Sequence, residues 1–443
     1  MANPHGTSTH FSTLRDDQTS QFWGQYSPYF DVPSKISTNL PTTCHYTFAQ
    51  LLSRHGARFP TVYKSWSYQL LVKRIQADVQ SFSGPYSFLR DYEYELGAGK
   101  LTAFGEHELV LSGKAFYARY NNLTRDQLPF IRASGQDRVI RSAEKFTGGY
   151  HIANLADKTG PGSLPSPSVA VILSEEHDSN NTLSIRTCPT FRRTPNSKVG
   201  INAKATWAAT FVPPIQDRLN SDLVGANLTA AEAIELMDLC PFETVANSGL
   251  ESLSPFCRLF TLEEWKSYDY YQALDKYYGH GMGNPLAPSL GVGFVNELIA
   301  RLTRKPVQDE TSTNHTLDSS NLTFPLDAKL YADFSHDNDM EAIFAAMGLY
   351  NATISLPLTA IQDAEHSHGF SAALTVPFAA RMYVEKMKCA GSDEEFVRVL
   401  VNNRVMPLHT CGADNPGRCR LDNFVRSLSF ARSGGLWARC FLS

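Results

Sequence analysis

The sequence lacks a long apolar run, and neither sign of charge is in large excess. A helix that crosses a bilayer needs roughly 20 consecutive apolar residues, and no stretch of the 443-residue chain approaches that length. The 40 Lys and Arg residues are balanced by 44 Asp and Glu residues, so the net charge is -4 and the pI is about 6.4. Proteins that bind nucleic acid or anionic membranes through a basic surface carry a positive excess. We therefore expect neither a nucleic-acid partner nor a membrane partner.

Two further signals are missing, a signal peptide and a Cys-x-x-Cys motif. Residues Met1–His5 contain neither the basic nor the apolar segment that directs secretion. The cysteines are even in number and widely scattered, which is typical of disulfides and not of a zinc site. We expect no metal and no cofactor. The eight cysteines are Cys44, Cys188, Cys240, Cys257, Cys389, Cys411, Cys419 and Cys440.

Asn-x-Ser/Thr sequons, the acceptor sites of N-glycosylation, occur along the whole chain. With the scattered cysteines they favour a secreted, glycosylated protein whose signal peptide has been replaced by Met1. The six sequons begin at Asn122, Asn180, Asn227, Asn314, Asn321 and Asn351.

A short polar motif that follows an apolar, β-prone run is the first candidate site. Residues 48–52 predict a strand, and Arg54-His55-Gly56-Ala57-Arg58 comes directly after it. If a helix begins near Gly56, both arginines and several backbone N–H groups converge on one anion beside His55. The motif therefore predicts a phosphate cradle that holds a potential nucleophile.

Two later strands end in the same way. Residues 128–131 predict a strand that leads to Arg138 and a helix, and residues 330–334 predict a strand that ends at His336-Asp337. A buried strand at 169–173 and a hairpin of 397–401 with 405–406 complete the expected strands. Because ligands bind beyond the carboxyl ends of strands in open α/β sheets, we expect these polar clusters to meet.

Strands that alternate with helices predict an α/β fold, a mainly parallel sheet flanked by helices on both faces. Long helical stretches near 65–125 and 200–290 are too extended for single crossovers, so we expect them to form a second, smaller all-α domain built from insertions. Thr229 and Thr261 each precede a Glu by three residues and predict capping boxes. Residues 306–322 are polar and predict an exposed loop. The expected division is 1–60, 126–198 and 288–443 for the large domain, and 61–125 and 199–287 for the small one.

The three polar clusters contain the parts of a phosphoryl-transfer site. Arg54, Arg58 and Arg138 offer guanidinium groups that match phosphate geometry, and His55 can attack phosphorus while its imidazole is neutral. His336 can donate to a phosphate oxygen, and Asp337 is the natural general acid. A free Asp titrates near roughly 3.9, so we expect an acidic optimum of roughly pH 3–6.

Taken singly, each motif has a simpler interpretation. An isolated Arg-His-Gly is usually a capped turn, a His-Asp pair after a strand is more often a surface turn or half of a metal site, and a single Arg138 is an ordinary ion-pair partner. Their occurrence together at strand ends, without a competing metal or Ser-His-Asp pattern, favours catalysis.

Arg54-His55-Gly56-x-Arg58-x-Pro60 together with His336-Asp337 resembles the histidine acid phosphatases, branch 2 of the histidine phosphatase superfamily. Within that family the chain looks like the secreted fungal phytases, and the resemblance covers nearly the whole sequence. The stretches that carry it are 22–29, 51–61, 277–285, 291–302, 334–338 and 427–435.

The resemblance implies a catalytic site between a large α/β domain and a small α domain. His55 would form a phosphohistidine, Asp337 would protonate the leaving alcohol, and Arg54, Arg58, Arg138 and His336 would bind the scissile phosphate. Arg138 is chosen over Arg132 and Arg141 because it lies six residues before Glu144, as in the family. The implied disulfides are Cys44–Cys389, Cys188–Cys440, Cys240–Cys257 and Cys411–Cys419.

The implied activity is that of a 3-phytase, which hydrolyses myo-inositol hexakisphosphate (phytate) and acts as a monomer. Lys64 matches a family lysine that faces the substrate, and further substrate contacts are expected from Gln25, Tyr26, Asn338, Lys276 and His280. Ser67 and Asp275 stand where some relatives have lysine, and Lys276 and Arg90 could compensate. We therefore expect a phytase with relatively broad substrate tolerance.

Other functions remain open at this point. One is a broad-specificity secreted acid phosphatase, or an inositol polyphosphate phosphatase of different regiochemistry. A different class is a catalytically inactive polyanion-binding glycoprotein, but binding alone requires only the cations and not His55 and Asp337. A phosphoglycerate-mutase-like role is disfavoured by the secretion features and by Asp337.

Overall fold

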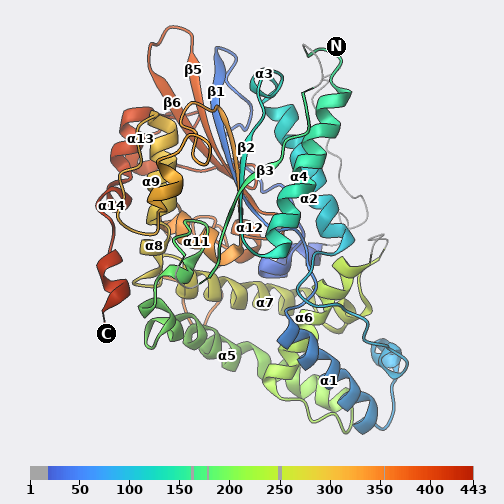
Figure 1. The fold of residues 1–443 in the computed structure, drawn as a ribbon. Coiled ribbons are helices and arrows are strands. Elements are labelled where there is room, and N and C mark those ends of the chain that lie inside the picture. Colours follow the sequence, from blue (N-terminus) through green and yellow to red (C-terminus); the bar gives the residue numbers. More distant parts are fainter. Residues whose placement is uncertain (1–17, 161–163, 177–178, 248–251, 354, 443) are drawn as a thin grey trace.

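A computed structural model describes residues 18–160, 164–176, 179–247, 252–353 and 355–442 (Figure 1). Its centre is an eight-stranded sheet with the order β3-β2-β4-β1-β5-β6-β7, and β8 pairs with β6. The strands are β1 Cys44–Arg54, β2 Phe130–Ser134, β3 Val169–Leu173, β4 Leu330–Ser335, β5 Arg381–Cys389, β6 Glu395–Val401, β7 Arg404–Val405 and β8 Cys419–Arg420.

The sheet is mixed. The β3-β2-β4-β1 half is parallel, as predicted, but β5, β6, β7 and β8 all pair antiparallel. β5 escapes detection in the sequence because its charged residues interrupt the apolar pattern, and the structure buries Glu385 against Arg398 of β6 at 2.7 Å. The hairpin predicted about Asn402-Asn403 is confirmed, since both residues have positive φ, as a tight hairpin turn requires.

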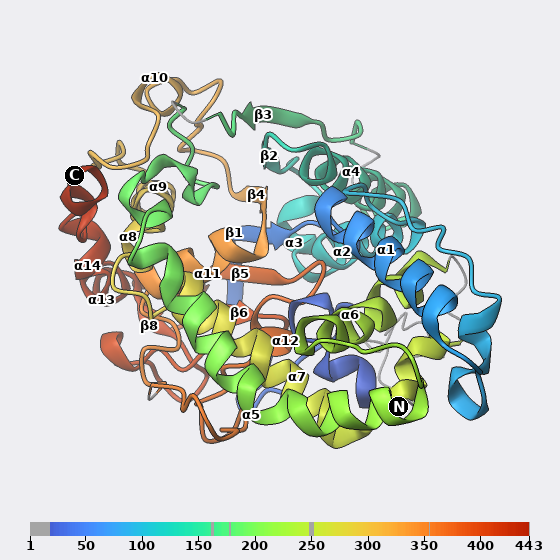
Figure 2. The same ribbon diagram turned by 90° about the horizontal axis from the view of Figure 1, so that it is seen from below.

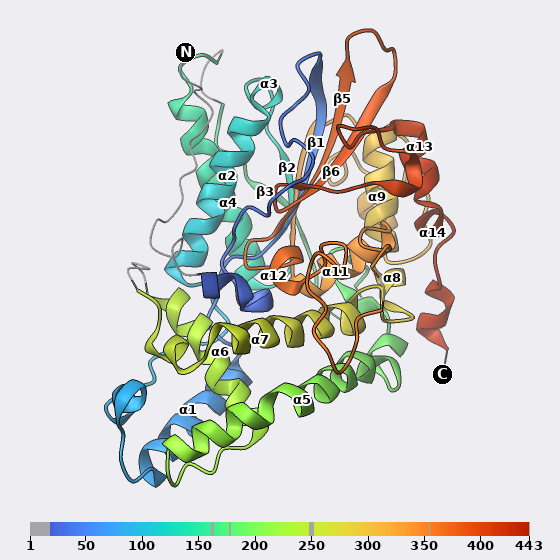
Figure 3. The same cartoon turned by 180° about the vertical axis from the view of Figure 1, so that it is seen from behind.

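Helices cover both faces of the sheet (Figures 1 and 3). On one face α2 (Ala103–Arg119) and α4 (Asp137–Ala156) lie together, and Phe146 of α4 packs against Phe116 of α2 and Phe334 of β4. On the other face lie α9 (Val292–Thr303), α11 (Asp337–Ala346) and α13 (Leu421–Ser427). The alternating buried residues of the central strands therefore have apolar partners on both sides.

A further group of helices crosses the carboxyl ends of the parallel strands (Figure 2). Both predicted capping boxes are present here, at Thr229 of α6 and Thr261 of α7. α2 packs mainly against α4 and the sheet and touches α6 as well; the division into two domains stays a prediction. The group consists of α1 Val62–Asp78, α5 Val199–Asp222, α6 Ala230–Ala246 and α7 Leu262–Asp275.

Two local predictions are wrong. No helix begins near Gly56; residues 55–61 form a loop, and α1 begins at Val62 after Thr61. The loop replaces the helix because residues 56–58 pack against α2, where a Cβ on Gly105 would lie 1.9 Å from the Ala57 carbonyl oxygen. Residues 306–322 are not simply exposed, because they contain the short helix α10 (His315–Asp318) and the buried side chains of Ser312 and Thr313.

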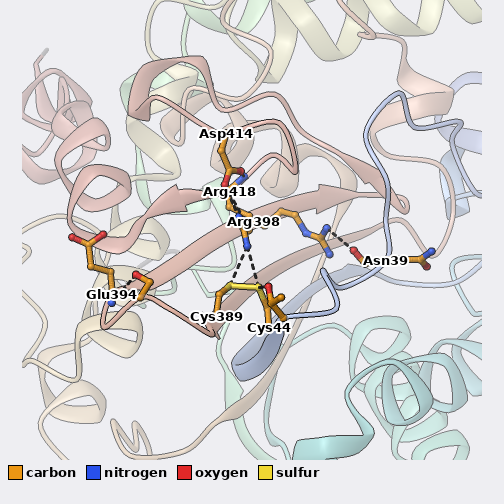
Figure 4. Close-up of a disulfide and its surroundings, with 9 residues drawn as sticks. Asn39, Cys44, Cys389, Glu394, Arg398, Asp414 and Arg418 are labelled. Carbon is orange, nitrogen blue, oxygen red and sulfur yellow. Dashed lines mark hydrogen bonds and ion pairs between the residues drawn. A yellow bond between two sulfur atoms is a disulfide. The ribbon is translucent and has the colours of Figure 1, made fainter.

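The cysteines form the four disulfides that the resemblance implies. Cys44–Cys389 joins the first residue of β1 to the last residue of β5 (Figure 4). Asp414 holds the Arg418 guanidinium, whose Nη1 lies 3.0 Å from each sulfur of this bridge. The bridge thus links β1 and β5 at the end of the pair that lies opposite His55, which follows the last residue of β1.

A buried ion network behind the site explains the role of Arg132. Asp333 on β4 accepts hydrogen bonds from Arg132 at 2.8 Å and from Arg301 at 2.6 Å, and Arg132 also pairs with Glu297 at 2.6 Å. All four side chains are buried. Arg132 is therefore part of the core, and it is not available to bind a ligand.

We expect Asp333→Asn to lower the free energy of unfolding by about 3–5 kcal/mol, because it leaves the buried guanidinium of Arg301 without a counter-charge and that of Arg132 with Glu297 alone. Chemical denaturation at neutral pH measures the change. The matched control is Glu394→Gln in the exposed pair with Arg420, for which we expect at most about 1 kcal/mol. A change of that small size for Asp333→Asn would show that the network contributes no net stability.

Candidate active site

A cavity of ≈ 680 Å³ is lined by residues from the carboxyl ends of the parallel strands and from the helices that cross them. Of the residues predicted to bind the scissile phosphate, Arg54 does not line it, but its fully buried guanidinium lies 3.4 Å from Asp337, which does. The cavity thus brings together residues that follow the parallel strands and residues of the helices that cross their ends. The predicted residues that line it are Gln25, Tyr26, His55, Arg58, Lys64, Arg138, Lys276, His280, His336, Asp337 and Asn338.

The parallel pairing of β1 with β4 places the two site histidines side by side. Arg54 is opposite Ser335 in the register, and the His55 backbone N–H donates to the Ser335 carbonyl at 3.1 Å. The rings of His55 and His336 follow at 5.5 Å between centroids. The predicted meeting of these two strand ends is therefore confirmed.

His55 has a defined tautomer. Its Nδ1 lies 2.8 Å from the Gly56 carbonyl oxygen, which can only accept, so Nδ1 carries the proton. Nε2 makes no hydrogen bond to the described residues and keeps its lone pair. Burial, followed by the charges of Arg54 and Arg138, holds the pKa of His55 well below its usual range. The imidazole is thus neutral in mild acid, as a nucleophile must be.

Two side chains from the flanking helices fix the loop that carries His55. Glu108 of α2 accepts the Ala57 backbone N–H at 2.8 Å, and Ser142 of α4 accepts the Gly56 N–H at 3.2 Å. Ser142 also donates to the Arg138 carbonyl at 2.7 Å. The loop and Arg138 are consequently held by the same helix.

The three site arginines have donors without partners. Arg54 donates through Nη1 to the carbonyls of Gln25 and Val376, but its Nε and Nη2 are buried without a hydrogen bond, as are Nε of Arg58 and Nε of Arg138. Burial, with repulsion from Arg58, lowers the pKa values of Arg54 and Arg138 to about 10. Buried cations with unused donors indicate an anion-binding site.

Asp337 begins α11 and faces two cations. Its Oδ2 lies 2.7 Å from Nζ of Lys276 and 3.4 Å from Nη2 of Arg54. Burial opposes the charge, but Arg54 and Lys276 outweigh it and hold the pKa of Asp337 well below its usual range. The carboxyl is therefore ionised in the free site, and the sequence-based value for a free Asp does not apply.

His336 is held by a residue that the sequence did not reveal. Its Nε2 lies 2.9 Å from Oε1 of Glu175, and its Nδ1 lies 3.5 Å from Nη2 of Arg138. Glu175 follows β3, the third parallel strand, so its position at a strand end was the available signal. This signal was weak, because a single Glu after a strand does not form a recognisable sequence motif.

The rim of the cavity differs from its prediction in several places. Lys64 is paired with Asp238 at 2.6 Å and with the Tyr26 hydroxyl at 3.1 Å. Burial opposes its charge, but Asp238 prevails and raises the pKa of Lys64. Gln25 donates to Gln272 at 2.9 Å, and burial lowers the pKa of His280 to about 4.

The predicted compensation by Arg90 is wrong. Arg90 is not among the lining residues and donates to the Phe82 carbonyl, while Ser67 donates to Glu235. Lys276 lines the cavity but belongs to its centre, since its Nζ also donates to Asn338 at 2.6 Å. Asp275 pairs with Lys204 at 3.4 Å. The lining cations that the sequence did not reveal are Arg186, Arg192 and Lys204.

Two features are absent from the described part of the chain. No helix there is long and apolar enough to cross a membrane. Within the same residues, no three His, Cys, Asp or Glu side chains are grouped so that they could hold a metal ion.

Comparison with known proteins identifies the family. Residues 46–402 match the model of the histidine phosphatase superfamily (branch 2). The chain is 53% identical to Phytase A of Aspergillus awamori over 96% of this chain and 91% of that protein, and 52% identical to Phytase A of Aspergillus fumigatus with the same coverage. The fold resembles the D. castellii phytase structure, with a TM-score of 0.75 at 23% identity over 98% of this chain and 91% of that one. The chain belongs to branch 2 of the histidine phosphatase superfamily.

Proposed function

We propose that this protein is a 3-phytase, an acid phosphomonoesterase that releases phosphate from myo-inositol hexakisphosphate through a phosphohistidine on His55. The observation that carries the proposal is the free Nε2 of a neutral His55 near the buried Nε donors of Arg54, Arg58 and Arg138, which make no hydrogen bond to the described residues. The substrate class is supported by sequence identity of 53% to two Phytase A proteins over nearly the full length of the chain.

In the first step, the scissile phosphate binds to Arg54, Arg58, Arg138 and His336. The Nε2 lone pair of His55 attacks phosphorus, the P–N bond forms, and the P–O bond to the inositol breaks. Asp337 gives a proton to the departing oxygen. The guanidinium groups stabilise the charge on the phosphoryl oxygens, which is the main catalytic need in this reaction.

In the second step, water attacks the phosphohistidine. The Asp337 carboxylate takes a proton from the water, the P–N bond breaks with its electron pair returning to Nε2 of His55, and inorganic phosphate leaves. Asp337, the acid of the first step, thus acts as the base of the second and regains its proton.

An acidic optimum follows from the charge state of Asp337. The free site keeps this carboxyl ionised through Arg54 and Lys276. Bound phosphate places a like charge beside it and competes for both cations, which raises its pKa. Because the first step needs the protonated form, activity falls as the pH rises through the pKa of Asp337 in the complex.

We expect Lys276→Met to move the alkaline limb of the kcat profile to higher pH by roughly one unit. Removal of the cation that most closely faces Asp337 raises the pKa of this carboxyl, so it stays protonated at higher pH. KM for phytate should rise as well, because a cation is lost from the cavity. An unchanged alkaline limb, measured between about pH 3 and 8, would contradict the assignment of Asp337 as the acid.

Substrate range is the part of the proposal that the rim decides. Lys64 and Lys204 are each paired with an acidic side chain, and Arg186 approaches Glu175 at 3.7 Å; Arg192 also lines the cavity. Partial neutralisation supports a phytase with broad tolerance, whose kcat/KM for phytate exceeds that for 4-nitrophenyl phosphate by less than about a hundredfold. Product analysis of phytate hydrolysis, with turnover of both substrates, tests this. No hydrolysis of phytate would favour a general acid phosphatase.

The four disulfides and the sequons support a secreted glycoprotein. We propose in addition that it acts as a monomer, since one chain supplies every residue of the mechanism.

A further inference from the structure

Glu175 places a carboxylate beside Arg138 and His336, two of the residues proposed to bind phosphate. It follows β3 and lines the same cavity as Arg138 and His336. Like charges repel, so a carboxylate beside a phosphate site weakens phosphate binding unless its charge is compensated. Its contacts show where the compensation comes from.

The Glu175 side chain is almost fully buried and touches His336 from the side of β2 and β3. Its Oε1 accepts from the Ser134 hydroxyl at 2.7 Å and lies 2.9 Å from Nε2 of His336. Ser134 in turn accepts from Nδ2 of Asn181 at 3.3 Å. Arg186 approaches the other carboxylate oxygen at 3.7 Å. The imidazole of His336 is thus backed by a chain of hydrogen bonds.

This arrangement decides which ring nitrogen carries the proton. Burial opposes the charge of Glu175, but the hydrogen bond from His336 prevails and lowers the pKa of Glu175 to about 2. An ionised carboxylate can only accept, so Nε2 of His336 must donate. In a doubly protonated ring the other proton is on Nδ1, and this is the form in which Nδ1 can donate to phosphate.

The other charged groups around His336 are consistent with that proton position. Nδ1 faces Arg138 of α4, the His55 ring lies on the β1 side, and Asp339 of α11 is a second nearby carboxyl. The Asp339 carboxyl is hydrogen-bonded elsewhere, because its Oδ1 accepts the Ile185 backbone N–H at 2.6 Å. Glu175 is therefore the carboxylate that engages the imidazole directly.

We propose that Glu175 is a positioning residue that holds the Nε2 proton of His336 and so presents Nδ1 as a donor to bound phosphate. The inference rests on the proposed function, since it assumes that phosphate binds beside His336. The competing role is purely structural, in which Glu175 only anchors Ser134. The two roles predict opposite signs, because a merely structural carboxylate repels phosphate and its neutralisation should tighten binding.

The test is a double-mutant cycle on the full chain, with Kd for inorganic phosphate measured by calorimetry at about pH 4.5. We expect Glu175→Gln to weaken binding at least roughly tenfold, the loss of a charge-assisted hydrogen bond. In a His336→Ala background the same change should not weaken binding. The exposed neighbour Glu176→Gln is the matched control and should have no effect. Equal weakening in both backgrounds, or no weakening by Glu175→Gln alone, would overturn the proposal.

Nitrogen NMR of the wild-type chain provides a second readout that does not depend on the variants folding. We expect the His336 proton on Nε2, with the Nδ1 signal responding to added phosphate. A proton on Nδ1 with a bare Nε2 would overturn the proposal. Neither experiment requires turnover, so failure to hydrolyse phytate would contradict the proposed function and leave the Glu175 measurement interpretable.

Discussion

His55→Ala should reduce phytate turnover by roughly 10⁵-fold or more, because no other described side chain offers a free nucleophile at this position. The neutral imidazole has its Nδ1 proton held by the Gly56 carbonyl, and its Nε2 lone pair has no hydrogen-bond partner among the described residues, whereas the Asp337 carboxylate is paired with Lys276. Positioning and charge stabilisation by the arginines survive the change, but no covalent intermediate can form. Steady-state release of phosphate from phytate measures the loss.

The same variant should remain folded. The hydrogen bond made by the His55 side chain is local, and its truncation opens the existing cavity without exposing a buried charge, so the free energy of unfolding should change by no more than about 2 kcal/mol. The exposed His366→Ala is the matched control and should retain full activity. A folded His55→Ala chain that keeps more than about one per cent of wild-type turnover would exclude His55 as the nucleophile.

Asp337→Asn should slow the first step for phytate by about 10²–10⁴-fold and for 4-nitrophenyl phosphate by less than about tenfold. The inositol oxygen leaves poorly without a proton, whereas 4-nitrophenolate leaves unaided. An amide keeps the shape of the carboxyl but cannot deliver the proton. Because Asp337 also serves as the base of the second step, the comparison must use the first turnover, measured by rapid quench.

Binding should move in the opposite direction to chemistry in this variant. Asp337 neutralises Lys276 and part of Arg54 in the free site, so its replacement leaves both cations free to attract phosphate. We therefore expect KM for phytate to stay the same or to fall while kcat drops. Equal first-turnover losses on both substrates would show that Asp337 is not the general acid.

The parallel half of the sheet and the meeting of the polar clusters were predictable from the sequence. A parallel strand must deliver its carboxyl end to the same edge as its neighbours, so His55 after β1 and His336 after β4 could be placed together. The disulfide pairs were available only from family resemblance. The antiparallel half was missed at β5, because the pairing of Glu385 with Arg398 that allows its burial is invisible in the order of residues.

The electrostatics of the site depend on contacts between distant segments. The ionised state of Asp337 comes from Lys276, which the π-helical segment Lys276–His280 brings to the start of α11. The paired state of Lys64 comes from Asp238 on α6. The sequence therefore predicted which residues line the cavity. Their charge states and ion-pair partners could be assigned only from the three-dimensional structure.

The central claim is the phosphohistidine on His55, and its direct test is to trap it. Asp337→Asn mixed with 4-nitrophenyl phosphate and quenched in alkali, where a P–N bond survives, should yield a peptide that carries one phosphoryl group on His55. Formation should match the burst of 4-nitrophenolate, and His55→Ala should show neither. A burst with no phosphoryl group on His55, or with one on another residue, would contradict the account.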